Sequence, residues 1–189
     1  MKNILFLGII FFFITSCSET YTPKPPAYFR ISFPEKIYQF SDSTIPYSFE
    51  YPQYATIVND TDKNAEPYWI NVVFPQFNGK IHISYKEVDN NVFKFIDDAH
   101  TMAYKHSVKA DAIGESVFEN ADNKVFGTLY SIEGNAASSI QFYLTDSVKH
   151  FVRGALYFNN IPNKDSIAPV VDFIEEDVIR LIDSFHWND

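Results

Sequence analysis

Cysteine and basic residues are both scarce in this sequence. Cys17 is the only cysteine among 189 residues, so no disulfide can form within the chain and the core must be stable by packing alone. The six glycines are scattered, and none belongs to a Gly-rich phosphate loop. Lys and Arg number 15 against 24 Asp and Glu, a net charge of −9. Because this acidity repels phosphates, we expect no nucleic-acid partner.

Long hydrophobic runs are also missing, apart from one near the start. Residues 4–14 are apolar, which is shorter than the roughly 18 to 20 residues of a spanning helix. Lys2 precedes the run, and the small residues Thr15 and Ser16 follow it immediately before Cys17. A positive tip, a short apolar centre and small residues at the end are typical of a secretory signal peptide. We therefore expect residues 1–16 to be removed.

The sequence Ile14-Thr15-Ser16-Cys17 resembles a bacterial lipobox. The resemblance implies that Cys17 becomes the lipidated first residue, carrying palmitate-type acyl chains that anchor the protein to a membrane. Two or three chains, as bacterial lipoproteins carry, are needed because one chain anchors only marginally. The alternative is an ordinary cleaved signal that leaves a free thiol.

Prolines dominate the segment that follows. Residues 17–27 include Pro23, Pro25 and Pro26, which favours an extended polyproline II tether of about 30 Å. Residues 28–34 then form an aromatic arm, which either packs onto the domain or docks a partner. The candidate partner contacts are Tyr28, Phe29, Arg30 and Phe33.

Hydrophobic periodicity predicts one α+β domain over residues 28–189. Aromatic and β-branched runs predict strands, Asn78-Gly79 predicts a hairpin, and 3.6-residue periodicity predicts two amphipathic helices. We expect an antiparallel sheet of about six or seven strands flanked by those helices. The predicted strands are 47–58, 68–74, 81–86, 112–119, 124–132, 138–145 and 150–158, and the predicted helices are roughly 91–107 and from 165 or 166 to 185.

No sequence motif for catalysis, a metal or a cofactor is present, so we expect none of these. One trio could form a hydrolase site: Ser138 or Ser139 as nucleophile, Asp146 as orienting acid and His150 as base. Polar residues of a turn and its strands are the simpler interpretation, because one hairpin does not bring these groups together.

Three histidines and four charged residues could also take part in binding. His100 and His106 lie about 120° apart around the predicted helix, so they do not chelate one metal ion. His82 lies on a polar strand face that we expect to be solvated. We expect a solvated helix face for Glu175, Glu176 and Asp177. Arg153 either forms a cross-strand salt bridge, which is the simpler interpretation, or binds an anion.

Several strings of residues resemble the gliding motility lipoprotein GldD family of the Bacteroidota. The resemblance implies a cell-envelope protein needed for surface gliding and linked to the type IX secretion machinery. It transfers lipidation to Cys17 and assigns no other residue a role. The element order also resembles the Mog1/PsbP-like fold. The matching strings are 21–25, 28–31, 103–106, 134–139, 145–147 and 153–158.

Three functions follow as hypotheses. The first is a non-enzymatic accessory or scaffold lipoprotein of the gliding and secretion apparatus, which would contact other envelope proteins. The second is a lipoprotein that binds a small apolar or lipid ligand in a pocket of some hundreds of Å³ between the sheet and the helices. The third, a serine hydrolase, requires the trio to converge. Only Glu19 supplies an acid soon after Cys17, which favours a periplasmic location.

Overall fold

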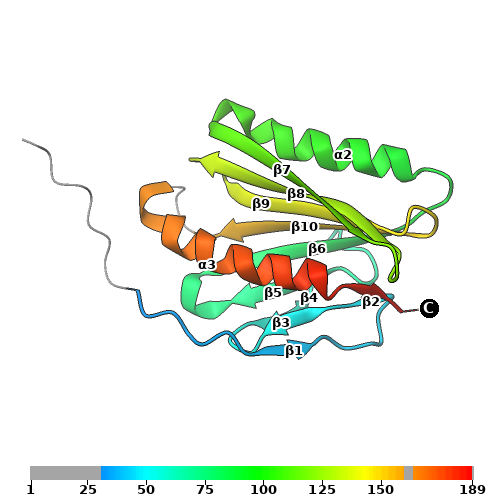
Figure 1. Cartoon of the computed structure of the whole chain (residues 1–189), viewed down its shortest axis with the longest axis horizontal. Helices are drawn as coiled ribbons and strands as arrows, with labels where there is room; N and C mark the ends of the chain where they lie inside the picture. Colours follow the sequence, from blue (N-terminus) through cyan, green and yellow to red (C-terminus); the bar gives the residue numbers. More distant parts are fainter. Residues whose placement is uncertain (1–30, 160–163, 189) are drawn as a thin grey trace, which may run out of the picture.

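Seven antiparallel strands form the main sheet, in the order β4-β5-β6-β10-β9-β8-β7 (Figure 1). The computed structural model describes residues 31–159 and 164–188. Two consecutive antiparallel runs, β4 to β6 and β7 to β10, meet where β6 pairs with β10. The strands are β4 (Thr56–Asn59), β5 (Ile70–Phe74), β6 (Gly79–Glu87), β7 (Ala110–Asn120), β8 (Val125–Gly134), β9 (Ser138–Thr145) and β10 (His150–Phe158).

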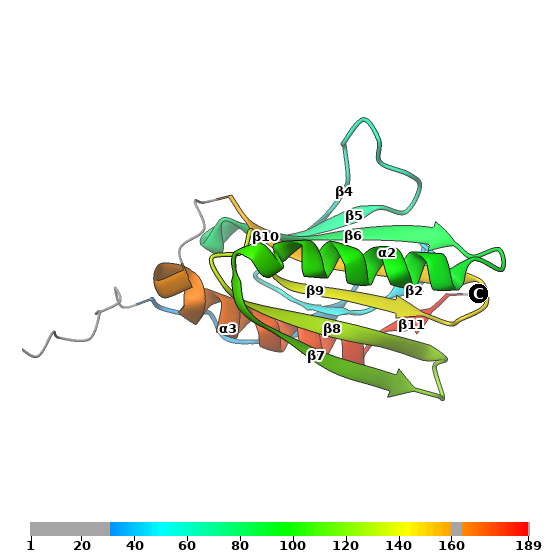
Figure 2. The same cartoon turned by 90° about the horizontal axis from the view of Figure 1, so that it is seen from above.

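Two helices cover opposite faces of this sheet. Helix α2 (Val92–Tyr104) links β6 to β7 and continues as the 3-10 turn η2 (Lys105–Val108), while α3 (Lys164–Asp183) follows β10. Figure 2 shows α2 above β9 and β10, with α3 on the far side. The α+β class, the element order and the two flanking helices are therefore confirmed.

The larger part of the core lies between the sheet and α3. Ile140, Phe142 and Leu144 alternate along β9, are each at most 1% exposed, and belong to one apolar cluster with Ile174 and Val178 of α3. This alternation is the period-two pattern that predicted the strand. A smaller cluster lies under α2, where the small side chain of Ala103 meets Tyr130 and Ile132 of β8.

Residues 47–58 differ from the single strand that was predicted. They form three short strands that enter three different sheets, because Pro52 has no N–H to continue a ladder. A local hydrogen bond, from the Ala55 N–H to the Pro52 carbonyl, turns the chain there. The short pairs are β2 (Tyr47–Ser48) with β11 (His186–Trp187) and β3 (Glu50–Pro52) with β1 (Tyr38–Phe40).

The hairpin predicted from Asn78-Gly79 is present between β5 and β6. Its connection is longer than a two-residue turn, because the 3-10 turn η1 (Pro75–Phe77) precedes Asn78. Asn78 has φ of 51° in the left-handed region, which asparagine tolerates better than most residues.

A glycine in β10 allows the neighbouring ring to pack. Gly154 lies opposite Phe142, and a Cβ built on it would lie 2.2 Å from that ring. We predict that Gly154→Ala lowers the free energy of unfolding by about 1 to 3 kcal/mol, as overpacking a core does. The matched control is Gly114→Ala on β7, whose Cβ would meet nothing within 3.9 Å and should change stability by less than about 0.5 kcal/mol. Urea unfolding measures both, and equal losses would contradict the packing argument.

Candidate functional site

The trio considered for hydrolysis does not assemble. Ser138 and Ser139 begin β9, whereas Asp146 and His150 lie beyond its other end. The separation along the strand is roughly 20 Å at about 3.3 Å per residue. The His150 ring is 2.7 Å from the Tyr85 hydroxyl instead. The interpretation as polar residues of a turn and its strands therefore holds.

Asp146 has a structural role in that turn. Its Oδ1 accepts hydrogen bonds from the backbone N–H groups of Val148, Lys149 and His150, at 2.8 to 2.9 Å. Partial burial alone would raise the pKa of Asp146, but these amides outweigh it and hold the pKa below its usual value. The Asp146 carboxylate thus stabilises the β9–β10 turn.

The histidines lie apart from one another. His82 is 3.7 Å from the Asp60 carboxylate, and burial lowers the pKa of His82, so this side chain is less solvated than expected. His100 stacks on Tyr104 with ring centroids 4.3 Å apart. The His106 side chain lies outside the described residues. Within residues 31–159 and 164–188, no three His, Cys, Asp or Glu side chains are grouped as a metal site.

Arg153 does not form the expected cross-strand salt bridge with any described acid. Its guanidinium donates to the Gln141 side-chain oxygen at 2.5 Å, and burial lowers the pKa of Arg153. Gln141 is 1% exposed, and both its amide nitrogen and the Arg153 Nε lack a partner in the described chain. An amide on the adjacent strand thus takes the place of the predicted carboxylate.

Asp177 lies in a different environment from the one that the sequence predicted. It was expected on a solvated face, but it is 2% exposed. Lys36 pairs with its Oδ1 at 2.9 Å, the Tyr38 hydroxyl donates to Oδ1 at 2.8 Å, and the Tyr54 hydroxyl donates to Oδ2. We call these four residues the clasp. The spacing could have revealed Asp177, which lies three residues after Ile174 and therefore on the apolar stripe of the helix.

The other two acids of that helix behave differently. Glu176 is 69% exposed and lies 3.3 Å from the Lys36 ammonium, at the rim of the clasp. Glu175 accepts a hydrogen bond from the Ser131 hydroxyl at 2.7 Å, on the side of α3 that faces β8. The solvated interpretation therefore holds for Glu176 alone.

The described part of the aromatic arm packs onto the domain. The Phe33 ring stacks on Phe173 of α3 with centroids 4.4 Å apart and remains 38% exposed. Lys36 lies over the same Phe173 ring at 4.1 Å and donates to the Phe173 carbonyl at 2.6 Å. Tyr28, Phe29, Arg30 and Cys17 lie outside the described residues.

The clasp determines where the chain from the expected anchor enters the fold. In Figure 1 the described chain begins beside the start of α3, and the C-terminal end lies at the opposite end of the domain. Ile31 lies fourteen positions after Cys17, a reach of at most about 50 Å. The chain from the expected attachment point therefore joins the described domain at the end that bears the start of α3.

A pocket of about 400 Å³ opens beside the first half of α3. Ile140, Ala168 and Val171 provide apolar walls. Glu133, Asp172 and Glu175 add carboxylates to the lining. Its volume is in the range that a small ligand needs, but its carboxylates would repel an anionic lipid headgroup.

Comparison with known proteins identifies the family. The profile of the gliding motility lipoprotein GldD family matches residues 18–187, and the chain belongs to this family. The resemblance found in the sequence is thus confirmed. The chain matches no curated protein sequence. Within the described residues, no helix has both the length and the apolar character needed to cross a membrane.

A solved structure shares the fold. The solution structure of cyanobacterial PsbP (CyanoP) from Synechocystis sp. PCC 6803 is similar with a TM-score of 0.51 at 13% sequence identity. The match covers 92% of this chain and 98% of that chain. At this identity the likeness concerns the fold alone, and it confirms the PsbP-like architecture.

The clasp yields a stability prediction with a neighbouring control. Asp177→Ala should lower the free energy of unfolding by about 3 kcal/mol or more, because it removes the acceptor of two tyrosine hydroxyls and the buried carboxylate that pairs with the Lys36 ammonium. Glu176→Ala should change it by less than about 0.5 kcal/mol, because an exposed ion pair contributes little. Urea denaturation compares the two variants, and similar losses would show that the clasp does not hold the arm.

The same contacts predict that the free energy of unfolding falls at alkaline pH. Burial, together with the Asp177 carboxylate, raises the pKa of Tyr38 and Tyr54 above the usual 10.0. The two tyrosines contribute fully to the free energy of unfolding below pH 10. This contribution is lost as pH rises above 10, because the unfolded chain then releases protons that the folded chain keeps. Tyr54→Phe should make the decline of unfolding free energy above pH 10 shallower by up to about 1.4 kcal/mol per pH unit. An unchanged slope in this variant would contradict the assignment.

Proposed function

We propose that this member of the GldD family is a non-enzymatic accessory or scaffold component of the gliding machinery and the associated type IX secretion apparatus, held on a membrane by lipid on Cys17. The observation that carries the proposal is the clasp. It ties the segment that follows the tether to α3 and thereby to the core. An anchor joined firmly to a folded body suits a part that must hold its position within an assembly.

The location proposed for this body is the periplasmic side of the cell envelope. The chain is acidic overall, so attraction to anionic lipid does not account for its attachment. Acyl chains of the palmitate type on Cys17 would supply the attachment instead. Other envelope proteins of the same apparatus are the proposed partners.

Fewer residues of the aromatic arm are proposed to contact a partner than the sequence indicated. Phe33 already stacks on Phe173, so its ring is largely engaged within the domain. The partner contact is accordingly proposed for Tyr28, Phe29 and Arg30, which precede it. In the sequence these residues lie between the proposed tether and Lys36.

Binding of a small apolar or lipid ligand is the second candidate, and the pocket beside α3 favours it. The pocket joins apolar residues of the sheet and the helix, as Ile140 and Val171 illustrate. Its carboxylates restrict the ligand to an uncharged or cationic headgroup. No such support exists for the hydrolase hypothesis, because Ser138 and Ser139 lie far from His150.

The lipid anchor can be tested in a gliding host that lacks the native protein. Cys17→Ala should move the protein from the membrane fraction to the soluble fraction and abolish colony spreading and type IX cargo secretion. The neighbouring Ser18→Ala keeps the cysteine and should behave as the unaltered chain. A Cys17→Ala protein that still sediments with membranes would count against lipidation, and normal spreading by the deletion strain would count against the role in gliding.

A further inference from the structure

Within residues 31–159 and 164–188, strand β7 leaves one long edge of the main sheet unpaired. It is the longest strand of the described chain, with 11 residues, and its described partner is β8. The edge at the other side of the sheet, β4, has only four residues. From Ala112 to Asn120 the β7 ladder runs without interruption, so its outer side offers a regular row of backbone donors and acceptors.

The side chains of β7 alternate between acid and exposed apolar groups on the face toward α2. Glu115 and Glu119 flank Val117 at period two, and Val117 is 81% exposed. The Tyr104 hydroxyl of α2 donates to Glu115 at 2.6 Å, and the His100 ring lies 3.9 Å from the same carboxylate. These contacts hold Glu115 on that face.

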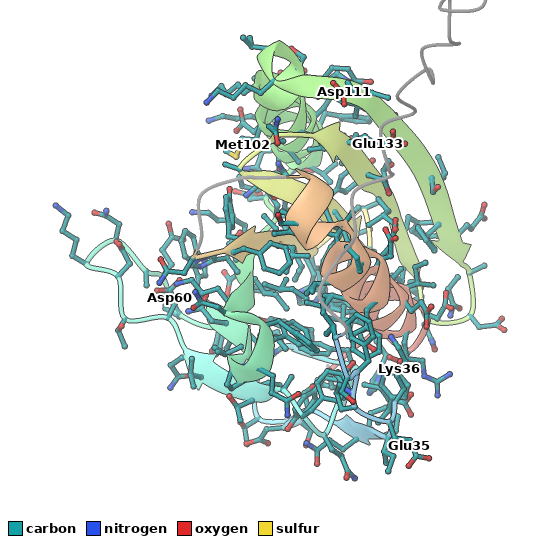
Figure 3. All side chains as sticks on the ribbon, turned by 90° about the vertical axis from the view of Figure 1, so that its left-hand side faces the viewer. Glu35, Lys36, Asp60, Met102, Asp111 and Glu133 are labelled. Carbon is teal, nitrogen blue, oxygen red and sulfur yellow. The ribbon has the colours of Figure 1, made fainter. Side chains whose placement is uncertain are left out.

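The surface on the other side of β7 is acidic as well. Between the β7–β8 turn and the end of α3 lies a pocket of about 320 Å³, whose lining includes Asp122 and Asp183. Neither this pocket nor the 400 Å³ pocket has a described Lys or Arg in its lining. In Figure 3, Asp111 and Glu133 lie together on the side of α3 opposite Lys36.

We propose that β7 is a docking edge for an extended, basic polypeptide segment of a partner, which adds to the sheet as an eighth strand. Strand addition would satisfy the free backbone groups of β7. Lysine or arginine side chains at every second position would face Glu115 and Glu119, and an apolar side chain between them would cover Val117. Opposite charges on neighbouring strands stabilise such a pairing.

A second copy of this chain fits the same edge poorly. Antiparallel pairing of two β7 strands about Val117 would place Glu115 of each copy opposite Glu119 of the other. Like charges directly opposite one another are destabilising. The charge of this edge therefore disfavours that self-pairing and is complementary to a basic chain.

The docking edge would be a contact site for the proposed scaffold role. Only the identity of the partner rests on that proposed function. Strand addition itself can be tested without a gliding host. The probe is a fluorescent nine-residue peptide of alternating lysine and valine, added to the full lipidated protein in detergent, with binding followed by anisotropy. A peptide with glutamate in place of lysine is the charge control. Failure of the peptide to bind would overturn the docking edge while leaving the Cys17→Ala phenotype intact.

Two exposed acids elsewhere provide a matched variant. Glu115→Lys with Glu119→Lys should weaken lysine–valine peptide binding about tenfold or more, since two attractive pairs become repulsive. Glu35→Lys with Glu87→Lys makes the same change in net charge away from β7, and binding should change less than about twofold. Equal weakening in both variants would show that net charge alone attracts the peptide and would overturn the proposal.

Peptides with methylated backbone nitrogens distinguish strand addition from loose electrostatic contact. N-methylation at alternate residues blocks one edge of an extended peptide, so two isomers can be made that block opposite edges. One isomer should bind as the parent does, and the other should lose binding at least tenfold. Identical behaviour of the two isomers, or equal binding of the glutamate peptide, would contradict pairing with β7.

Discussion

A carboxylate that is 2% exposed must be neutralised and hydrogen-bonded where it lies, because burying an unpaired charge costs several kcal/mol. Asp177 meets this requirement with groups from two separate stretches of chain: Lys36 and Tyr38, just before and at the start of β1, and Tyr54 just before β4. These contacts hold α3 with its apolar face on the sheet. The position of α3, and with it the larger core, depends on these contacts.

The same constraint links attachment to folding. Within residues 31–40, Phe33 and Lys36 both contact Phe173 of α3, and strand β1 pairs with β3. Arg180 strengthens this region from α3, since it pairs with Glu50 of β3 and lies over the Tyr38 ring at 5.6 Å. Residues 31–40 are thus part of the fold.

The regular elements could be predicted from sequence, because their signals are local. Alternation along β9 and the 3.6-residue stripe of α3 each follow from which face is buried. The clasp could not be predicted from the same signals, since the partners of Asp177 lie more than 120 residues away. Hydropathy treats aspartate as a surface residue, although its spacing placed it on the buried stripe. Likewise, Pro52 was visible as a break, but nothing local indicated that the chain on either side would enter different sheets.

The orientation of the docking edge follows from the fold and the anchor together. Strand β7 begins at the end of the domain where the described chain starts and runs toward the end that holds the C-terminal residues (Figure 1). Added strands run along their neighbours, so a partner segment on β7 would extend between the end where the described chain starts and the end that holds the C-terminal residues. Lys36 of the clasp lies on the other side of α3 from Asp111 and Glu133 (Figure 3). Attachment and docking would then use opposite sides of one helix, and a partner could bind at β7 without disturbing the contacts that hold the anchor segment.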